Sequence, residues 1–134
     1  MKTIMTLLFA VVLASSAYAA GVTVDYQVNN QTYEGYYISN TKGAPLVLLV
    51  HDWDGLTDYE VKRAEMLAEL GYAVFAADLF GAGVRPTEMA DKRQHTGALY
   101  QDRDKLRALL QGALNAAKEQ GGNVANAVSV GYCF

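Results

Sequence analysis

The stretch from Leu46 to Val50 is apolar at every position. A strand with one face in water alternates apolar and polar residues, so a short run without alternation is typical of a strand covered on both faces. Parallel sheets have such strands, because helices cover both of their faces. A later segment, Tyr72 to Ala77, has the same character, and Ala127 to Gly131 is similar with Ser129 as its one polar residue. The pattern predicts three buried strands of a parallel sheet.

Helical patterns lie between these runs. Thr57 and Glu60 have the spacing of a capping box and Gly71 is a helix stop, which predicts a helix between Thr57 and Gly71. A longer helix is expected over 100–119, where leucines and alanines recur at helical spacing before Gly121-Gly122.

The segments 22–28 and 32–38 alternate and flank Asn29-Asn30, which predicts a β-hairpin. The order hairpin, strand, helix, strand, helix, strand predicts an α/β fold, with a mostly parallel sheet and flanking helices.

The first residues have the features of an export signal. Lys2 precedes the apolar stretch from Ile4 to Ala14, and Ala17-Tyr18-Ala19 offers a cleavage site with small outer residues. We therefore expect a signal peptide over 1–19, one domain over 20–134, and a periplasmic or secreted product. The apolar stretch is too short for a permanent membrane span, so no stable anchor is expected after cleavage.

Composition narrows the classes of partner. The formal net charge is −3 and the basic residues form no stripe, which argues against binding to nucleic acid. Cys133 is the only cysteine, and neither histidine lies at metal-ligand spacing from it, so no metal or cofactor is expected. A single cysteine in an exported chain is either a small buried residue or a thiol kept for its reactivity.

Three segments follow the buried strands, and ligands bind beyond the carboxyl ends of such strands. They are His51-Asp52-Trp53-Asp54-Gly55, Asp78-Leu79-Phe80-Gly81 and the end of the chain at Cys133. Cys133 in Gly-x-Cys after a strand has the position of a nucleophile, with a buried strand-end cysteine as the alternative.

Asp52 could accept a proton from that thiol, or simply cap its own turn in solvent. The backbone N–H groups of Trp53 and Phe134 are the candidate donors to an oxyanion. Asp54 is interpreted as a turn residue, His51 as a strand-end residue that orders the loop, and His95 as a solvated surface residue.

Several motifs in this order resemble the dienelactone hydrolase family of α/β hydrolases. They are HDWDGLTDYEVKRAEMLAELGYAVFAADLFG and, much later, VGYCF. The family pattern is similar to His-Glu-Trp-Trp-Gly-Leu, a helix ending Leu-Ala-Glu-Leu-Gly-Tyr, then Pro-Asp-Leu-Tyr-Gly and Gly-Tyr-Cys-Phe-Gly-Gly. The resemblance implies the N-terminal portion of an α/β-hydrolase fold, incomplete after the nucleophile.

The resemblance also implies roles for single residues. Cys133 matches the nucleophile of a Cys-Asp-His triad, and Asp52 stands where the family has a glutamate that is one methylene longer. Trp53 and Phe134 match the oxyanion-hole positions. Arg85 is the nearest substitute for an arginine that binds anionic substrates in some members, and the triad Asp and His would lie beyond Phe134.

These features predict an exported hydrolase that cleaves a small ester or lactone through a cysteine acyl-enzyme. The implied loss of two triad residues leads us to expect no appreciable turnover from the 134 residues themselves. The alternative from another class is a catalytically inactive remnant or a non-enzymatic binding protein. A redox-sensing thiol ranks last, because no resolving cysteine accompanies Cys133.

Overall fold

A computed structural model describes residues 19–134 of the chain. The expected signal peptide lies outside the described residues, apart from Ala19. In the described part, no helix is long and apolar enough to cross a membrane. The elements are β1 (Val22–Val28), β2 (Gln31–Ser39), β3 (Pro45–Val50), α1 (Asp58–Glu69), β4 (Ala73–Ala77), α2 (Met89–Gln101), α3 (Arg103–Glu119) and β5 (Asn123–Gly131).

The strands form one sheet in the order β1-β2-β4-β3-β5. β3 pairs in parallel with β4 on one side and with β5 on the other, as the apolar runs predict. β1 and β2 are the predicted antiparallel hairpin, and β2 then joins β4, also in antiparallel fashion. The expectation of a mostly parallel sheet is therefore refined to a mixed sheet, because the hairpin docks against the parallel strands through β2.

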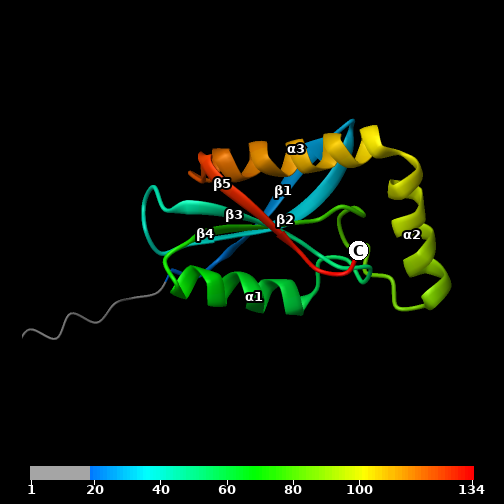
Figure 1. Cartoon of the computed structure of the whole chain (residues 1–134), viewed down its shortest axis with the longest axis horizontal. Coiled ribbons are helices and arrows are strands. Elements are labelled where there is room, and N and C mark those ends of the chain that lie inside the picture. Colours follow the sequence, from blue (N-terminus) through cyan, green and yellow to red (C-terminus); the bar gives the residue numbers. More distant parts are fainter. Residues whose placement is uncertain (1–18) are drawn as a thin grey trace, which may run out of the picture.

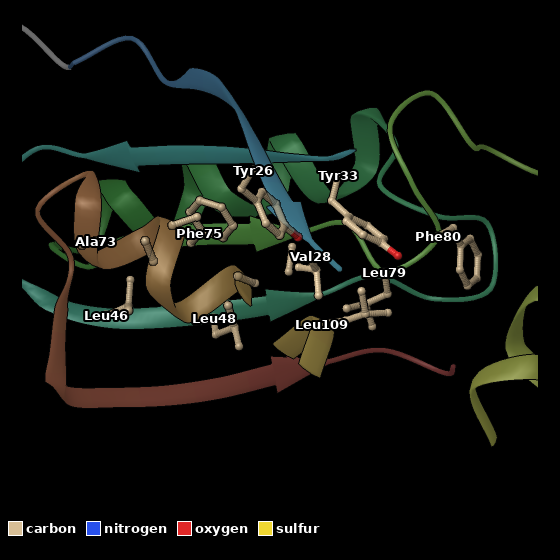
Figure 2. Close-up of a cluster of buried hydrophobic side chains, with 14 of the residues drawn as sticks. Tyr26, Val28, Tyr33, Leu46, Leu48, Ala73, Phe75, Leu79, Phe80 and Leu109 are labelled. Carbon is tan, nitrogen blue, oxygen red and sulfur yellow. The ribbon is translucent and has the colours of Figure 1, made fainter. Parts of the chain in front are cut away.

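The helices cover the two faces of this sheet, with α1 on one side and α3 on the other (Figure 1). Successive β3 residues alternate between the two cores. Leu46 and Leu48 belong to the cluster that includes α3 residues, and Val47 and Leu49 belong to the cluster that includes α1 residues. Figure 2 shows the first cluster, in which Phe75 of β4 lies near Tyr26 of the hairpin. The unbroken apolar run thus reflects burial on both faces.

Local signals in the sequence place the turns and caps. Asn29 and Asn30 have φ of 51° and 63°, the left-handed conformation that a two-residue hairpin turn needs at both positions. The Thr57 N–H donates to Glu60 Oε2 at 2.9 Å, which completes the predicted capping box. Glu60 is 1% exposed, so this polar pair also fixes the entry of α1 into the core.

The expected single helix over 100–119 is in fact preceded by a second helix. α2 ends at Gln101, and Asp102, at φ −114° and ψ 81°, separates it from α3. The Asp102 side chain accepts a hydrogen bond from Lys105 N at 2.9 Å and so caps α3. α2 has no apolar stripe and buries only Thr96 and Leu99, which explains why apolar periodicity gave no sign of it.

The third apolar run is a strand, but it is not buried. β5 lies at the edge of the sheet, and Val128 and Val130 are 59% and 37% exposed. In the described part of the chain, β5 pairs only with β3. Its composition is that of a central strand, while its surroundings are those of an edge.

The buried and exposed leucines allow a matched test of this core. Leu49→Ala should lower the free energy of unfolding by about 3 kcal/mol, because a fully buried leucine leaves a cavity. Leu70→Ala, at a site that is 75% exposed, should change it by less than about 0.5 kcal/mol. Urea denaturation of both variants measures the difference, and equal losses would contradict the assignment of the core.

Candidate active site

The pairing of β3 brings three strand ends together. Val50 is in register with Ala77 of β4 and with Gly131 of β5. The segments that follow, starting at His51, Asp78 and Tyr132, therefore leave the sheet side by side. This is the edge at which the sequence places its candidate residues, and α2 lies at the same end of the molecule as the C-terminus (Figure 1).

His51 is fully buried and both of its ring nitrogens have partners. Leu79 N donates to Nε2 at 3.1 Å, and Nδ1 lies 2.5 Å from the carbonyl oxygen of Asp52. Nδ1 must then carry the hydrogen, which defines one neutral tautomer. Burial, the largest influence, lowers the pKa of His51 below its usual value. His51 ties the β3 and β4 loops together, as interpreted from the sequence, and has no free nitrogen to act as a base.

The loop from Asp52 to Gly55 is a tight turn, and hydrogen bonds accepted by Asp52 hold it. Asp52 Oδ1 accepts from Asp54 N at 2.8 Å, and the Asp52 carbonyl accepts from Gly55 N at 3.4 Å. Gly55 has a φ of 86°, and a Cβ there would lie 2.8 Å from the carbonyl oxygen of Val84. One Asp52 oxygen thus caps its own turn, which agrees with the simpler of its two interpretations and leaves Oδ2 for another role.

Trp53 and Asp54 in this turn face helix α2. Trp53 is 37% exposed, and the Lys92 ammonium lies 5.7 Å from the centroid of its ring. Lys92 Nζ also lies 2.6 Å from Asp54 Oδ1, in an ion pair. Asp54 is therefore more than a turn residue, because it links the loop after β3 to α2.

Asp78 is a buried carboxylate that the sequence analysis did not single out. It accepts hydrogen bonds from Phe80 N at 2.9 Å, from Gly81 N at 3.1 Å and, across the sheet, from Glu34 N at 3.2 Å. A carboxylate directly after a buried strand was the available signal, but only the register of β2 against β4 shows that it also holds β2.

Arg85 is paired with two carboxylates. Its Nη2 lies 3.3 Å from Glu34 Oε1, and its Nη1 lies 3.8 Å from Asp78 Oδ1. It borders a hollow of about 600 Å³ that Glu34 and the first turn of α1 also line. The guanidinium charge is thus engaged within the protein, which weakens the expected role of Arg85 in binding an anionic substrate.

Phe134 lies in a group of aromatic rings at the strand ends. Its ring centroid is 5.7 Å from that of His51, 5.9 Å from Phe80 and 6.0 Å from Tyr100. The Tyr100 hydroxyl also donates to the Phe134 carbonyl. His95 stacks on Phe80 at 4.9 Å and is partly buried, so its interpretation as a solvated surface residue is wrong. The unrecognised helix α2 carries it to this place.

Cys133 is exposed between two anchored neighbours. The Tyr132 hydroxyl accepts from Arg63 Nε at 3.0 Å, and its ring packs edge-on against Tyr59 at 5.3 Å. Tyr132 therefore packs on the α1 side of the sheet, while Phe134 packs with the cluster on the other side. The backbone on either side of the thiol is held by these two side chains, and the thiol itself is free to react.

Two backbone groups next to these residues are available as donors. Among the hydrogen bonds of residues 19–134, none is donated by the N–H of Trp53 or of Phe134. These are the two positions expected to stabilise an oxyanion. Within the same residues, no group of three or more His, Cys, Asp or Glu side chains is placed to hold a metal ion.

Comparisons with known proteins identify the family and the fold. The model of the dienelactone hydrolase family matches residues 33–134. A solved structure named m3DLH has a TM-score of 0.81 and 29% identity, over 86% of this chain and 50% of its own. The dienelactone hydrolase-like promiscuous phosphotriesterase P91 from metagenomic libraries has a TM-score of 0.80 and 27% identity, over 88% and 51% of the two chains.

The dienelactone hydrolase from Anabaena variabilis, at 19% identity, shares the fold with a TM-score of 0.58, over 84% of this chain and 51% of its own. The chain thus spans about half the length of these solved structures. No curated protein matches it.

The buried histidine predicts a dependence of stability on pH. The lowered pKa means that below its ordinary value of 6.5 the unfolded chain binds a proton that folded His51 resists. The contribution of neutral His51 to stability is therefore present above pH 6.5 and lost as the pH falls through the lower, folded-state value. Urea midpoints of wild type and His51→Gln, measured from about pH 7.5 down to pH 5, should converge toward the acid side.

Gln94→Ala, at an exposed position without a titratable side chain, is the control and should run parallel to wild type. A His51→Gln curve that stays parallel to wild type over the same range would contradict the neutral assignment.

Proposed function

The chain belongs to the dienelactone hydrolase family, and from that premise we propose that its Cys133 thiol attacks the carbonyl carbon of a carboxylic ester or lactone. The observation that carries the proposal is the place of Cys133, exposed directly after β5 and beside the loops that follow β3 and β4. An accessible thiol at the carboxyl ends of a parallel sheet has the position of a nucleophile in this class of fold.

The proposed reaction begins with loss of the thiol proton. We assign this proton to Asp52, whose Oδ2 is not used in the turn that Oδ1 caps. The thiolate then adds to the ester carbonyl, and the negative charge moves to the carbonyl oxygen. The N–H groups of Trp53 and Phe134 are the proposed donors to that oxygen, and their lack of other partners among residues 19–134 supports this. Collapse of the intermediate breaks the bond to the leaving oxygen and forms a thioester, and the leaving oxygen takes the proton back from Asp52 to depart as the alcohol.

Hydrolysis of that thioester requires a base that can activate water. His51 is unsuited to this, since both of its ring nitrogens are engaged. In the family's Cys-Asp-His triad this task belongs to the histidine. We therefore propose that the residues of this chain carry the acylation half of the reaction, which can be followed as a single turnover.

The charges around the site favour an uncharged substrate. Arg85 is engaged with Glu34 and Asp78, and Lys92 is engaged with Asp54. Because these two cations are paired and the Asp52 carboxylate is adjacent, a substrate carboxylate gains no free charge from Arg85 or Lys92 and is repelled by Asp52. A neutral ester or lactone is thus the proposed substrate class.

Acylation of the single cysteine tests this proposal. With p-nitrophenyl acetate the chain should release about one equivalent of p-nitrophenolate and gain one acetyl group, and Cys133→Ala should abolish both. Iodoacetamide alkylates the same thiol without forming an oxyanion. The ratio of acylation to alkylation rates should exceed that of N-acetylcysteinamide by about tenfold or more, because single oxyanion donors contribute about 10²–10³-fold.

An anionic ester, p-nitrophenyl hemisuccinate, should acylate Cys133 more slowly relative to the same reference thiol. A rate ratio equal to that of N-acetylcysteinamide would reject the hydrolase and favour a non-catalytic binding protein, for which the exposed apolar edge at β5 is the supporting feature.

We also propose that residues 1–19 direct export to the periplasm or the outside. Support comes from the apolar stretch and the Ala17-Tyr18-Ala19 site. Expressed in a Gram-negative host, the chain should be recovered outside the cytoplasm with a mass that begins at Ala20. Ala19→Arg should block cleavage, while Tyr18→Phe, at the tolerant middle position, should not. An uncleaved cytoplasmic wild-type product would reject export.

A further inference from the structure

Lys92 contacts the loop after β3 through two interactions. Its ammonium lies 2.6 Å from Asp54 Oδ1 and 5.7 Å from the ring centroid of Trp53. Only 16% of the Lys92 side chain is exposed, although lysine ammonium groups are normally left in water. A lysine held in this way on an otherwise polar helix indicates a specific contact.

The Asp54 carboxylate depends on this contact. Its Oδ1 atom is buried and receives no aligned hydrogen bond from residues 19–134. The nearby Lys92 charge is thus what compensates it, and a buried carboxylate oxygen without compensation is costly. If Lys92 were neutral, the carboxylates of Asp52 and Asp54 would repel each other within one short turn.

The other hydrogen bonds of the turn involve His51 and Asp52 and do not hold the side chains of Trp53 and Asp54. Asp52 Oδ1, the Asp52 carbonyl and His51 hold the turn from the strand side. On the other side, Lys92 forms a cation–π contact with Trp53 and an ion pair with Asp54. The Trp53 N–H belongs to the peptide group between Asp52 and Trp53. The orientation of this peptide group therefore depends both on the hydrogen bonds of Asp52 and on the contacts of Lys92.

Helix α2 reaches the second candidate donor as well. Near its other end, Tyr100 donates to the Phe134 carbonyl and packs on the Phe134 ring. Between these two points, His95 stacks on Phe80. α2 therefore contacts both residues whose N–H groups are the proposed oxyanion donors.

We propose that Lys92 is a positioning residue that holds Trp53 and Asp54 so that the Trp53 N–H keeps its orientation toward the oxyanion formed at Cys133. The role rests on the proposed function, since it concerns the same thiol and the same donor. An ordinary surface ion pair would contribute little and could be removed without effect on the loop. The short distance, the low exposure of the Lys92 side chain and its contact with Trp53 distinguish this pair, in which the Asp54 side chain is 42% exposed.

Trp53 is the only tryptophan in the chain, so its fluorescence reports on the turn directly. In the purified chain, Lys92→Met should shift the emission of Trp53 and increase its quenching by acrylamide, because the ring loses its cover. Lys92→Arg keeps the cation and should restore both values. Lys62→Met, on the exposed side of α1, is the matched control and should leave them unchanged. Unaltered emission and quenching in Lys92→Met would overturn the proposal.

The chemical readout separates positioning from general stability. Lys92→Met should slow acylation of Cys133 by p-nitrophenyl acetate by about tenfold or more, since it misplaces an oxyanion donor. Alkylation by iodoacetamide has no oxyanion and should keep its wild-type rate. Far-ultraviolet circular dichroism checks that the variant is folded, and Asp54→Asn, which breaks the same pair from the other side, should give the same split if Lys92→Met does not fold.

The outcomes distinguish a failure of the proposed function of Cys133 from a failure of the proposed role of Lys92. A wild-type acylation-to-alkylation ratio equal to that of N-acetylcysteinamide overturns the proposed function, and this role for Lys92 with it. A raised wild-type ratio that persists in both Lys92→Met and Asp54→Asn overturns the role of Lys92 alone. Equal slowing of acylation and alkylation would also overturn it, because that result reflects altered thiol access.

Discussion

The parallel pairing of β3 with strands on both of its sides is the constraint on which the rest of the structure depends. Because Val50 is in register with Ala77 and Gly131, three loops leave the sheet at one edge. Nothing in those loops has to fold independently to bring Cys133, Asp52 and Asp78 to the same end of the molecule. The apolar residues that bury β3 therefore also bring the polar residues of the three loops to one edge of the sheet.

Polar side chains then hold these loops in place. His51 joins the loops after β3 and β4, and Asp78 receives backbone hydrogen bonds from its own loop and from β2. Arg85 and Lys92 each face a carboxylate, and Arg63 donates to the Tyr132 hydroxyl. These ion pairs and hydrogen bonds hold the loops in place, and the pairing of Arg85 and Lys92 is the basis of the proposed preference for an uncharged substrate.

Sequence patterns predicted the elements whose burial is regular. The run at Leu46–Val50, the capping box at Thr57 and the turn at Asn29-Asn30 each have one local cause, and the structure confirms all three. The family motifs likewise placed Cys133 beyond β5. Helix α2 was missed because its contacts are made by single polar and aromatic side chains, such as Lys92 and His95, which leave no periodic trace.

The ion pairs of Arg85 and the errors at His95 and β5 share a cause that lies outside local sequence patterns. The partner of Arg85, Glu34, is far away in sequence and comes near only through the β2–β4 pairing. His95 lies in a polar segment, yet Phe80 covers one face of its ring. β5 was expected to be buried because it is apolar, but the composition of a strand does not indicate whether other elements cover it. Roles at Cys133, Asp52, Trp53 and Phe134 remain predictions that the geometry makes testable.

Cys133, the candidate nucleophile, thus follows the most exposed strand of the sheet. Its backbone must therefore be held by contacts other than burial of β5. Burial does not fix the end of β5, because its residues are almost all exposed. Tyr132 is held from α1 through Arg63, and Phe134 is held from α2 through Tyr100. Because one contact comes from α1 and the other from α2, the residues on either side of Cys133 are each held by a side chain of a different helix. Helix α2 therefore acts on both halves of the proposed oxyanion site, through Lys92 at Trp53 and through Tyr100 at Phe134.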